Sequence, residues 1–425
     1  MNCDIKNALR KSTAAVLLAA GLLFGGSLDD VARCKPRQGW PHFFGKLAAK
    51  EPVTIAYIGG SITEQQGWRD GTFDNFVKTY PDVEFTQINS AIPGTNSQLG
   101  AARIDRDVLS KDPDLVFIEF AVNDGNSEYS QKTFEGMVRK IYDADINTDI
   151  CFVYTIWNGQ IEKYLYNGRY QPSASGMEVV AEHYGVPSIH MAFYAAKLLR
   201  EDKLVFKAPL STKDKIAFSP DGVHPYTQTG HPLYTRAVVD SLVEIENAST
   251  AGERIVPLAL HKDDWQDAKL VSLSEVRKSE SWQEITTKKS KLFAEFGKFM
   301  PRIWMADKNG SSISFAFKGT AVGIYGIKGP DVGMLKIELD SREPELITFF
   351  DSYCTAGRYK LKSVMLAYGL SDDVHRVKIT VDEAMPDKAA ILAKGGNEYK
   401  DNEEFNSRKA YIGDIIINGE LTEFE

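Results

Sequence analysis

The stretch VTIAYIGGSITEQQGW, residues 53–68, decides how the first half of the chain is interpreted. Its first residues are mostly apolar, and several are β-branched or aromatic, which is typical of a strand buried in a parallel sheet. Two glycines then turn the chain into Ser61. Gly-Gly-Ser after a strand is either an ordinary tight turn or a scaffold that holds a serine nucleophile at the edge of a sheet. The stretch by itself leaves both interpretations open.

The same rhythm of apolar runs and helical patterns continues to about residue 247. The further apolar runs are VEFTQIN (83–89), DLVFIEF (114–120), DICFVYT (149–155) and VPSIHM (186–191). Between them, apolar residues recur at helical spacing, as in Phe73, Phe76, Val77 and Tyr80. Apolar strands alternating with amphipathic helices predict a parallel sheet covered on both faces, a three-layer α/β/α domain over residues 28–250. A last helix is expected from about Gln228 to Glu246.

The second half, residues 251–425, has a different pattern. Runs such as SSISFAFKG (311–319) and HRVKITVDE (375–383) alternate or nearly alternate between apolar and polar residues, with Gly, Asp and Asn between them. Strands without intervening helices predict an antiparallel β-sandwich of jelly-roll type. This domain either binds carbohydrate or serves to stabilise the first domain and cover part of its cleft. Its most distinctive segment, residues 349–370, does not indicate a ligand.

Composition excludes several classes of function. The chain of 425 residues carries a net charge of −8, so no basic field is available for binding nucleic acid. The same acidic balance favours a neutral or modestly charged substrate. The chain has four cysteines, no two of them at metal-ligand spacing, and its histidines form no metal pattern. We therefore expect neither a metal nor another cofactor.

The N-terminus has the pattern of a secretory signal peptide over residues 1–27. Lys6, Arg10 and Lys11 precede the apolar run AAVLLAAGLLFGG (14–26), which is too short to span a bilayer comfortably. A signal peptide predicts a secreted or periplasmic protein with no membrane segment after cleavage. The alternative is a buried helix, for which Asp4 within the basic region is an argument.

The ends of the predicted strands carry polar residues that complement one another. Ser61 follows the first strand, Gly94 the second and Asn123 the third, while Asp221 and His224 lie just before the last helix. Ligands of open α/β sheets bind beyond the carboxyl ends of the strands, so these residues are expected at one edge. There Ser61 would be the nucleophile, His224 its base and Asp221 the group that orients the imidazole. The backbone N–H groups of Ser61 and Gly94 and the side-chain amide of Asn123 would form the oxyanion hole.

This order of residues resembles the SGNH/GDSL hydrolase superfamily, over roughly residues 50–245. Ser61, Gly94, Asn123 and His224 match its four lettered positions, and Asp221 matches the acidic partner. The segments IAYIGGSIT, FIEFAVNDG and DGVHPY are similar to a carbohydrate-esterase branch that removes acetyl groups from glycans. The resemblance implies a flavodoxin-like fold for the first domain. Two departures are Gly60, where the family usually has an acidic residue, and Pro93 before Gly94.

The predicted function is therefore a serine esterase that removes O-acetyl groups from a carbohydrate through an acyl-enzyme. Aromatic side chains suit sugar rings, so Trp68, Trp157 and Tyr164 are candidate substrate-binding residues; the alternative for each is packing within its own domain. Two other functions stay open: hydrolysis of a lipid or small ester, and glycan binding without catalysis. Neither the oligomeric state nor the particular glycan follows from the sequence.

Overall fold

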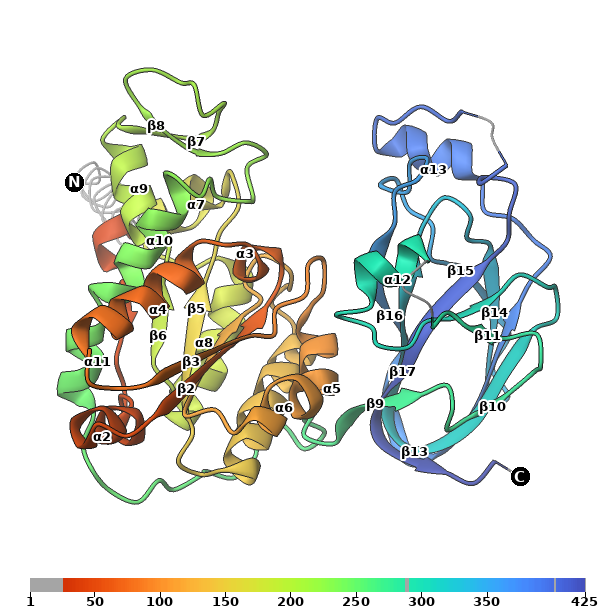
Figure 1. The fold of residues 1–425 in the computed structure, drawn as a ribbon, viewed down its shortest axis with the longest axis horizontal. Helices are drawn as coiled ribbons and strands as arrows, with labels where there is room; N and C mark the ends of the chain where they lie inside the picture. Colours follow the sequence, from red (N-terminus) through yellow and green to blue (C-terminus); the bar gives the residue numbers. More distant parts are fainter. Residues whose placement is uncertain (1–25, 287–289, 401–402, 425) are drawn as a thin grey trace, which may run out of the picture.

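The computed structural model describes residues 26–286, 290–400 and 403–424, which form two domains (Figure 1). The predicted signal peptide lies outside the described residues except for its last two positions. Within the described ranges, no helix is long and apolar enough to cross a membrane.

The first domain contains a parallel sheet in the strand order β3-β2-β4-β5-β6, with a short antiparallel strand, β1, at the edge beside β6. Its strands are β1 (Cys34–Lys35), β2 (Val53–Gly59), β3 (Phe85–Asn89), β4 (Leu115–Glu119), β5 (Asp149–Tyr154) and β6 (Ser188–His190). The chain order reverses between β2 and β4, which creates the switch point where α/β proteins of flavodoxin type bind their ligands. The predicted fold class of this domain is confirmed.

Helices cover both faces of this sheet (Figure 1). They are α2 (Pro41–Ala49), α3 (Ser61–Glu64), α4 (Trp68–Thr79), α5 (Ser97–Asp107), α6 (Glu128–Ala144), α7 (Gln160–Lys163), α8 (Pro172–Tyr184), α9 (Phe193–Arg200), α10 (Gly230–Val239) and α11 (Leu242–Ala248), with the 3₁₀ turns η1 (Leu28–Asp30), η2 (Leu109–Lys111) and η3 (Leu165–Asn167). Alternate residues of each central strand point to opposite faces, so Ile58 packs with α5, α6 and α8, whereas Tyr57 packs with α2, α4 and α10.

Two details of this domain differ from the sequence prediction. The expected helix over residues 228–246 is two helices, α10 and α11, because the hydroxyl of Ser241 bonds the carbonyl oxygen of Ala237 and helps to interrupt the helix there. A separate parallel pair of strands, β7 (Leu204–Lys207) and β8 (Ile216–Ser219), precedes the turn that carries Asp221.

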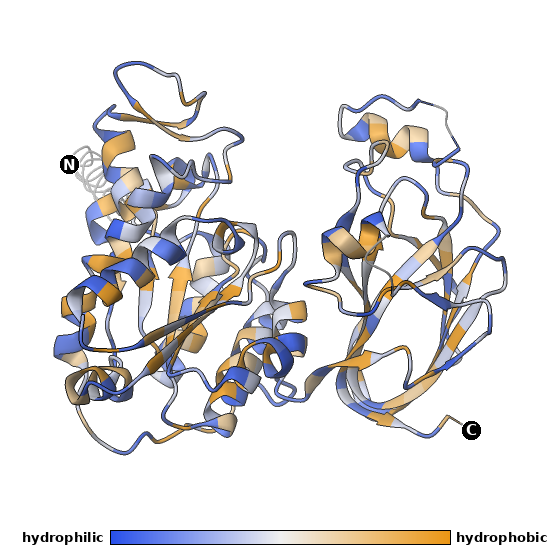
Figure 2. Cartoon of the chain, in the orientation of Figure 1, coloured by the Kyte–Doolittle hydropathy of each residue, from blue (hydrophilic) through white to orange (hydrophobic). Residues whose placement is uncertain are grey.

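The second domain is an antiparallel sheet of nine strands that folds over itself as a sandwich (Figure 1). The strands are β9 (Ala268–Ser272), β10 (Arg277–Lys278), β11 (Gln283–Glu284), β12 (Trp304–Ala306), β13 (Ser312–Lys328), β14 (Met334–Leu339), β15 (Glu345–Thr348), β16 (Lys360–Val381) and β17 (Ala410–Thr422). Apolar residues line the strands in the interior of this domain (Figure 2). The predicted sandwich is confirmed, although two short helices, α12 (Lys291–Phe296) and α13 (Lys388–Lys394), were not expected.

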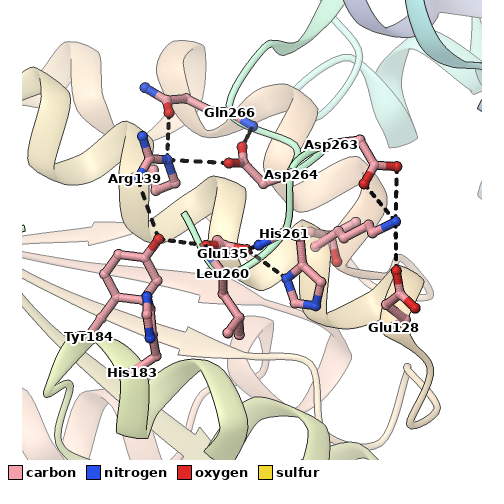
Figure 3. Close-up of polar contacts among 12 residues, drawn as sticks. Glu128, Glu135, Arg139, His183, Tyr184, Leu260, His261, Asp263, Asp264 and Gln266 are labelled. Carbon is pink, nitrogen blue, oxygen red and sulfur yellow. Dashed lines mark hydrogen bonds and ion pairs between the residues drawn. The ribbon is translucent and has the colours of Figure 1, made fainter. Parts of the chain in front are cut away.

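The segment between the domains is held against helix α6 (Figure 3). The fully buried carboxylate of Glu135 accepts hydrogen bonds from the backbone N–H groups of Leu260 and His261, from the His261 ring at 2.6 Å and from the Tyr184 hydroxyl at 2.6 Å. Other side chains of α6 bond the linker at Asp263, Asp264 and Gln266. We call this set of contacts the linker clasp. It fixes where the chain enters the sandwich.

Direct contacts join the two domains as well. Arg106 on α5 forms an ion pair with Asp414 at 3.6 Å, and the rings of Tyr129 and Tyr368 lie 4.2 Å apart between centroids. One continuous hydrophobic cluster includes residues of α5, α6 and the sandwich. The sandwich is therefore packed against the first domain and positioned at the side where β2 and β4 end (Figure 1).

Candidate active site

The two glycines before Ser61 are explained by what lies against them. A Cβ atom at Gly59 would come within 2.6 Å of the carbonyl oxygen of Glu119 on the neighbouring strand β4. A Cβ atom at Gly60 would come within 2.5 Å of the side-chain oxygen of Asn123. The glycines thus permit close approach to β4 and to the residues after it, and Ser61 begins helix α3 directly at the switch point.

Ser61, His224 and Asp221 form one hydrogen-bonded chain. The Ser61 Oγ lies 2.8 Å from Nε2 of His224, and Nδ1 of the same ring lies 2.6 Å from Oδ2 of Asp221. Because the ionised carboxylate can only accept, the proton between His224 and Asp221 belongs to Nδ1, which leaves Nε2 free to accept the serine proton. This arrangement would allow His224 to take a proton from the Ser61 hydroxyl.

The turn before α10 fixes the orientation of the Asp221 carboxylate. Its Oδ1 accepts hydrogen bonds from the backbone N–H of Val223 (2.8 Å), the backbone N–H of His224 (2.9 Å) and the Ser219 hydroxyl (3.0 Å). The Ser219 Oγ in turn accepts from the N–H of Gly222. Partial burial raises the pKa of Asp221, but these hydrogen bonds together with that from the His224 ring outweigh it and hold the pKa well below its usual range. Asp221 is therefore ionised at neutral pH.

The three predicted oxyanion donors lie around Ser61. Ser61 is the first residue of α3, so its N–H lacks a carbonyl partner within the helix. Gly94 lines the same cleft and has a φ of +72°, a backbone conformation that favours glycine. The Asn123 side chain packs against Gly60, next to Ser61. Asn96 stabilises the Gly94 loop by capping α5, and its side-chain oxygen also accepts from Ser363 of the sandwich at 3.3 Å.

Two carboxyl groups at this edge, the fully buried Glu119 and the partly buried Asp124, were given no role from the sequence. Glu119, at the end of β4, accepts hydrogen bonds from Thr63 in α3 and from Thr155 after β5. Asp124 accepts from the N–H of Ser97 at the start of α5, and burial raises its pKa to about 7. Glu119 is the last residue of β4 and Asp124 lies five residues later in the segment FIEFAVNDG, where the carboxyl group of Glu119 inside an apolar run was the available signal. They support the turns around the site from below.

A cleft of about 720 Å³ opens in front of Ser61, a size typical of ligand sites. Ser61, Pro93, Gly94 and His224 form the wall that belongs to the first domain. The opposite wall comes from the sandwich: from α12 and the residues after it, from the end of β13 and from residues 353–362. The segment 349–370, which carried no interpretation in the sequence, thus supplies much of this wall. The cleft is shared by the two domains.

The three candidate aromatic residues differ in position. Trp68 is wholly buried and packs edge-on against Tyr57 and Phe117, so the prediction that it binds substrate is wrong. Helix α4 begins at this residue and turns its ring into the core. Trp157 is 45% exposed, and the neighbouring Asn158 donates its N–H to the carbonyl oxygen of Gly222 in the Asp221 turn. Its role at the rim of the site stays a prediction.

Tyr164, the third candidate, is half-buried beyond α7 and does not line the cleft. Its ring is covered by the Lys163 ammonium, 5.2 Å from the centroid. A role in binding substrate close to Ser61 receives no support from this position, although a longer glycan could reach it.

His231 has a structural role. It lies in the first turn of helix α10, a few residues after His224. Its Nδ1 accepts the N–H of Trp68 at 3.1 Å, and burial lowers its pKa to about 4, so the ring is neutral. In the part of the chain that the structure describes, no group of His, Cys, Asp and Glu side chains could hold a metal ion. Cys34, Cys151 and Cys354 are free and buried there.

Comparison with known proteins agrees with this geometry. No curated protein matches the chain significantly. The fold is similar to that of a two-domain esterase active on acetylated mannans, in a structure co-crystallised with mannopentaose (TM-score 0.71, 22% identity, 92% of this chain and 98% of that chain) and in a second structure (TM-score 0.70, 21% identity, 91% and 98%). An acetylxylan esterase from Geobacillus stearothermophilus also matches (TM-score 0.34, 18% identity, 45% and 94%). The model of the GDSL-like lipase/acylhydrolase family matches residues 57–231. This match covers most of the α/β domain, including the positions of Ser61, Gly94, Asn123, Asp221 and His224.

Proposed function

We propose that this protein is a carboxylic ester hydrolase that removes O-acetyl groups from a carbohydrate, with Ser61 as its nucleophile. The observation that carries the proposal is the hydrogen-bonded chain Ser61–His224–Asp221 at the bottom of a cleft formed by two domains. The family match and the shared fold with a two-domain esterase active on acetylated mannans support it.

In the proposed reaction, His224 Nε2 takes the Ser61 proton while Oγ attacks the acetyl carbonyl carbon. The N–H groups of Ser61 and Gly94 and the Asn123 amide stabilise the oxyanion. His224 then gives its proton to the sugar oxygen, which leaves as a free hydroxyl, and the acetyl group stays on Ser61. A water deprotonated by His224 attacks this ester and releases acetate, with the proton returning to Ser61.

The walls of the cleft favour a carbohydrate over a long acyl chain. Tyr353 and Tyr359 offer aromatic faces, and charged side chains surround them. The aliphatic and phenyl side chains of the cleft are Phe296, Phe299 and Leu361 on the sandwich wall and Pro93 beside Ser61, so most of the apolar surface lies on the sandwich wall. We therefore assign the short acyl group to the Ser61 side and the sugar to the sandwich side.

The test is acetate release from acetylated oligosaccharides and from p-nitrophenyl acetate. Ser61→Ala should abolish both reactions, whereas the control Ser211→Ala, at an exposed loop position, should leave them unchanged. Equal activity of wild type and Ser61→Ala would refute the assignment. Preference for p-nitrophenyl octanoate over the acetate would instead indicate a lipid or long-chain esterase.

We also propose that the protein is exported, with residues 1–27 removed as a signal peptide. The basic and apolar pattern of the N-terminus supports this. N-terminal sequencing of the protein recovered from a bacterial periplasm or medium would test it, and an intact N-terminus in the cytoplasmic fraction would contradict it.

A further inference from the structure

The sandwich wall of the cleft is strongly basic, in contrast to the net charge of −8 of the whole chain. Five of its side chains are cationic, namely Lys298, Lys328, Arg358, Lys360 and Lys362, and the acidic side chain among the lining residues is that of Glu295. A positive wall on an acidic protein is a local feature that sequence composition conceals. It lines the same cleft as Ser61.

Two of these cations already have partners. Lys328 forms an ion pair with Asp351, and Lys298 lies 3.0 Å from a carboxylate oxygen of Glu64 in the first domain. For Arg358, Lys360 and Lys362, no side-chain hydrogen bond or ion pair occurs among the described residues. We call these three residues the unpaired basic strip.

Strand geometry directs the strip to one side. The three residues lie at positions i, i+2 and i+4 in the sequence RYKLK. Lys360 and Lys362 belong to β16, where such positions share a face of the strand, and Arg358 lies two residues before the strand begins. Lys360 and Lys362 open β16, and all three line the cleft. The three cationic side chains thus line the same cleft as Ser61, together with Tyr359 and Leu361 between them.

The row is crowded with like charge. Lys360 lies directly opposite Lys328 in the register of β16 with β13, and like charges at opposed strand positions destabilise a sheet. Burial lowers the pKa of Lys360, and the nearby charges of Lys328 and Arg358 lower it further. An anion bound here would relieve this repulsion, which points to an anionic ligand.

A ring that could receive a sugar lies among these charges. Tyr353 is 57% exposed and lines the cleft. The ammonium of Lys360 is 4.6 Å from its ring centroid and that of Lys328 is 5.3 Å away. An aromatic face beside donors of positive charge fits a sugar ring that carries an acidic substituent.

We propose that the substrate is an acetylated glycan bearing an anionic group, a carboxylate or a sulfate, which the unpaired basic strip binds while Ser61 takes the acetyl group. This rests on the proposed esterase function and specifies its substrate class. Arg358 provides a planar pair of donors that matches a carboxylate or sulfate, and the two lysines supply point charges along the glycan. The acidic substituent belongs on the sugar that carries the ester or on its neighbour.

The test compares kcat/KM for three acetylated oligosaccharides of equal length: one built of uronic acids, one sulfated and one neutral. Wild type should prefer at least one of the two acidic substrates, and which one it prefers identifies the anion. The triple variant Arg358→Gln, Lys360→Gln, Lys362→Gln should lower the ratio of acidic to neutral kcat/KM by about 10-fold or more. Lys308→Gln is the matched control, because Lys308 is an exposed lysine before the far end of β13, and it should leave the ratio unchanged.

Two results separate this inference from the proposed function. Equal kcat/KM for neutral and acidic substrates, or an equal loss on both in the triple variant, overturns the anionic substrate while the esterase function stands. Absence of acetate release from all three substrates and from p-nitrophenyl acetate overturns both. Raising the salt concentration offers an independent check, since it should reduce the acidic-to-neutral ratio of wild type more than that of the triple variant.

Discussion

Replacing Asp221 by Asn tests the geometry of the site most directly. The two carboxylate oxygens of Asp221 face different partners: Oδ1 accepts from two backbone N–H groups and the Ser219 hydroxyl, and Oδ2 faces Nδ1 of His224. An asparagine has only one side-chain oxygen, so it can take the place of either Oδ1 or Oδ2, and its NH₂ group takes the other place. Its NH₂ group cannot occupy the Oδ1 place, where it would meet two N–H donors.

The magnitude follows from these contacts. Turning the amide round would sacrifice the three hydrogen bonds that Oδ1 accepts, at about 1 kcal/mol each, so about 3 kcal/mol favours the orientation with its NH₂ group toward His224. That NH₂ group requires an unprotonated Nδ1, which moves the ring proton to Nε2 and prevents it from accepting from Ser61. The competent tautomer then falls below about 1%. With the lost stabilisation of the imidazolium, kcat should drop about 10⁴-fold, or about 5.4 kcal/mol.

The assay is steady-state hydrolysis of p-nitrophenyl acetate at pH 7 to 8, with far-UV circular dichroism to verify folding. Asp214→Asn is the control, since Asp214 is an exposed residue seven positions earlier whose side chain forms no hydrogen bond or ion pair with any described residue. It should retain full activity. A loss of less than about 10-fold in Asp221→Asn would show that the carboxylate does not set the tautomer, and the proposed mechanism would then be wrong.

Three further predictions concern the surroundings of the site. Gly60→Ala should displace the Asn123 side chain, whose oxygen lies 2.5 Å from the new Cβ, and should lower kcat by about 10²-fold with little change in KM. Gly125→Ala is the control and should be neutral, because a Cβ there meets open space. Equal kinetics for the two variants would contradict the role of Asn123. Glu135→Ala should lower the free energy of unfolding in urea by about 3 kcal/mol, because the donors of the linker clasp lose their acceptor; an unchanged midpoint would argue against the clasp. Burial lowers the pKa of His190 to about 4, so the unfolded state binds more protons than the folded state between pH 4 and 6.5, and the free energy of unfolding falls as the pH falls through that window. In His190→Gln the difference in the free energy of unfolding between pH 7 and 4.5 should therefore shrink by about 2.5 kcal/mol. An identical pH profile in the variant would contradict a neutral buried ring.

Much of the first domain could be predicted because its strands and helices are specified by hydrophobic patterns within short segments of the sequence. Apolar runs alternating with amphipathic helices fix a parallel sheet, and in such a sheet the residues after each strand meet at one edge. Ser61, Gly94 and Asn123 could be placed together for this reason alone. Asp221 and His224 are three residues apart, so a single turn brings their side chains into contact.

The error at Trp68 has an equally physical cause. Its distance of seven residues from Ser61 indicated proximity, which is correct, but not direction. The four-residue helix α3 and the turn at Gly67 bring the chain round so that α4 starts with its first side chain in the core. Direction depends on dihedral angles in a short irregular segment, and these leave no periodic signal.

The sandwich wall could not be predicted, because it depends on contacts between residues about three hundred positions apart. Net charge is an average over the chain, so it favoured a neutral substrate and concealed the basic residues at 358, 360 and 362. Their alternation in RYKLK was visible, but an exposed strand edge with charged residues has the same pattern. Only the packing of the two domains brings that row into the same cleft as Ser61.

The linker clasp has a consequence for how the cleft is maintained. A free tether of roughly twenty residues would let its ends separate by about 25 Å on average, and the second wall would then be present only at millimolar effective concentration. Glu135 removes most of that freedom by holding the tether halfway along its length. Closing the cleft therefore requires little attraction between its two walls. The residues that line the cleft can therefore be substituted to suit a different substrate while the linker still holds the two domains together.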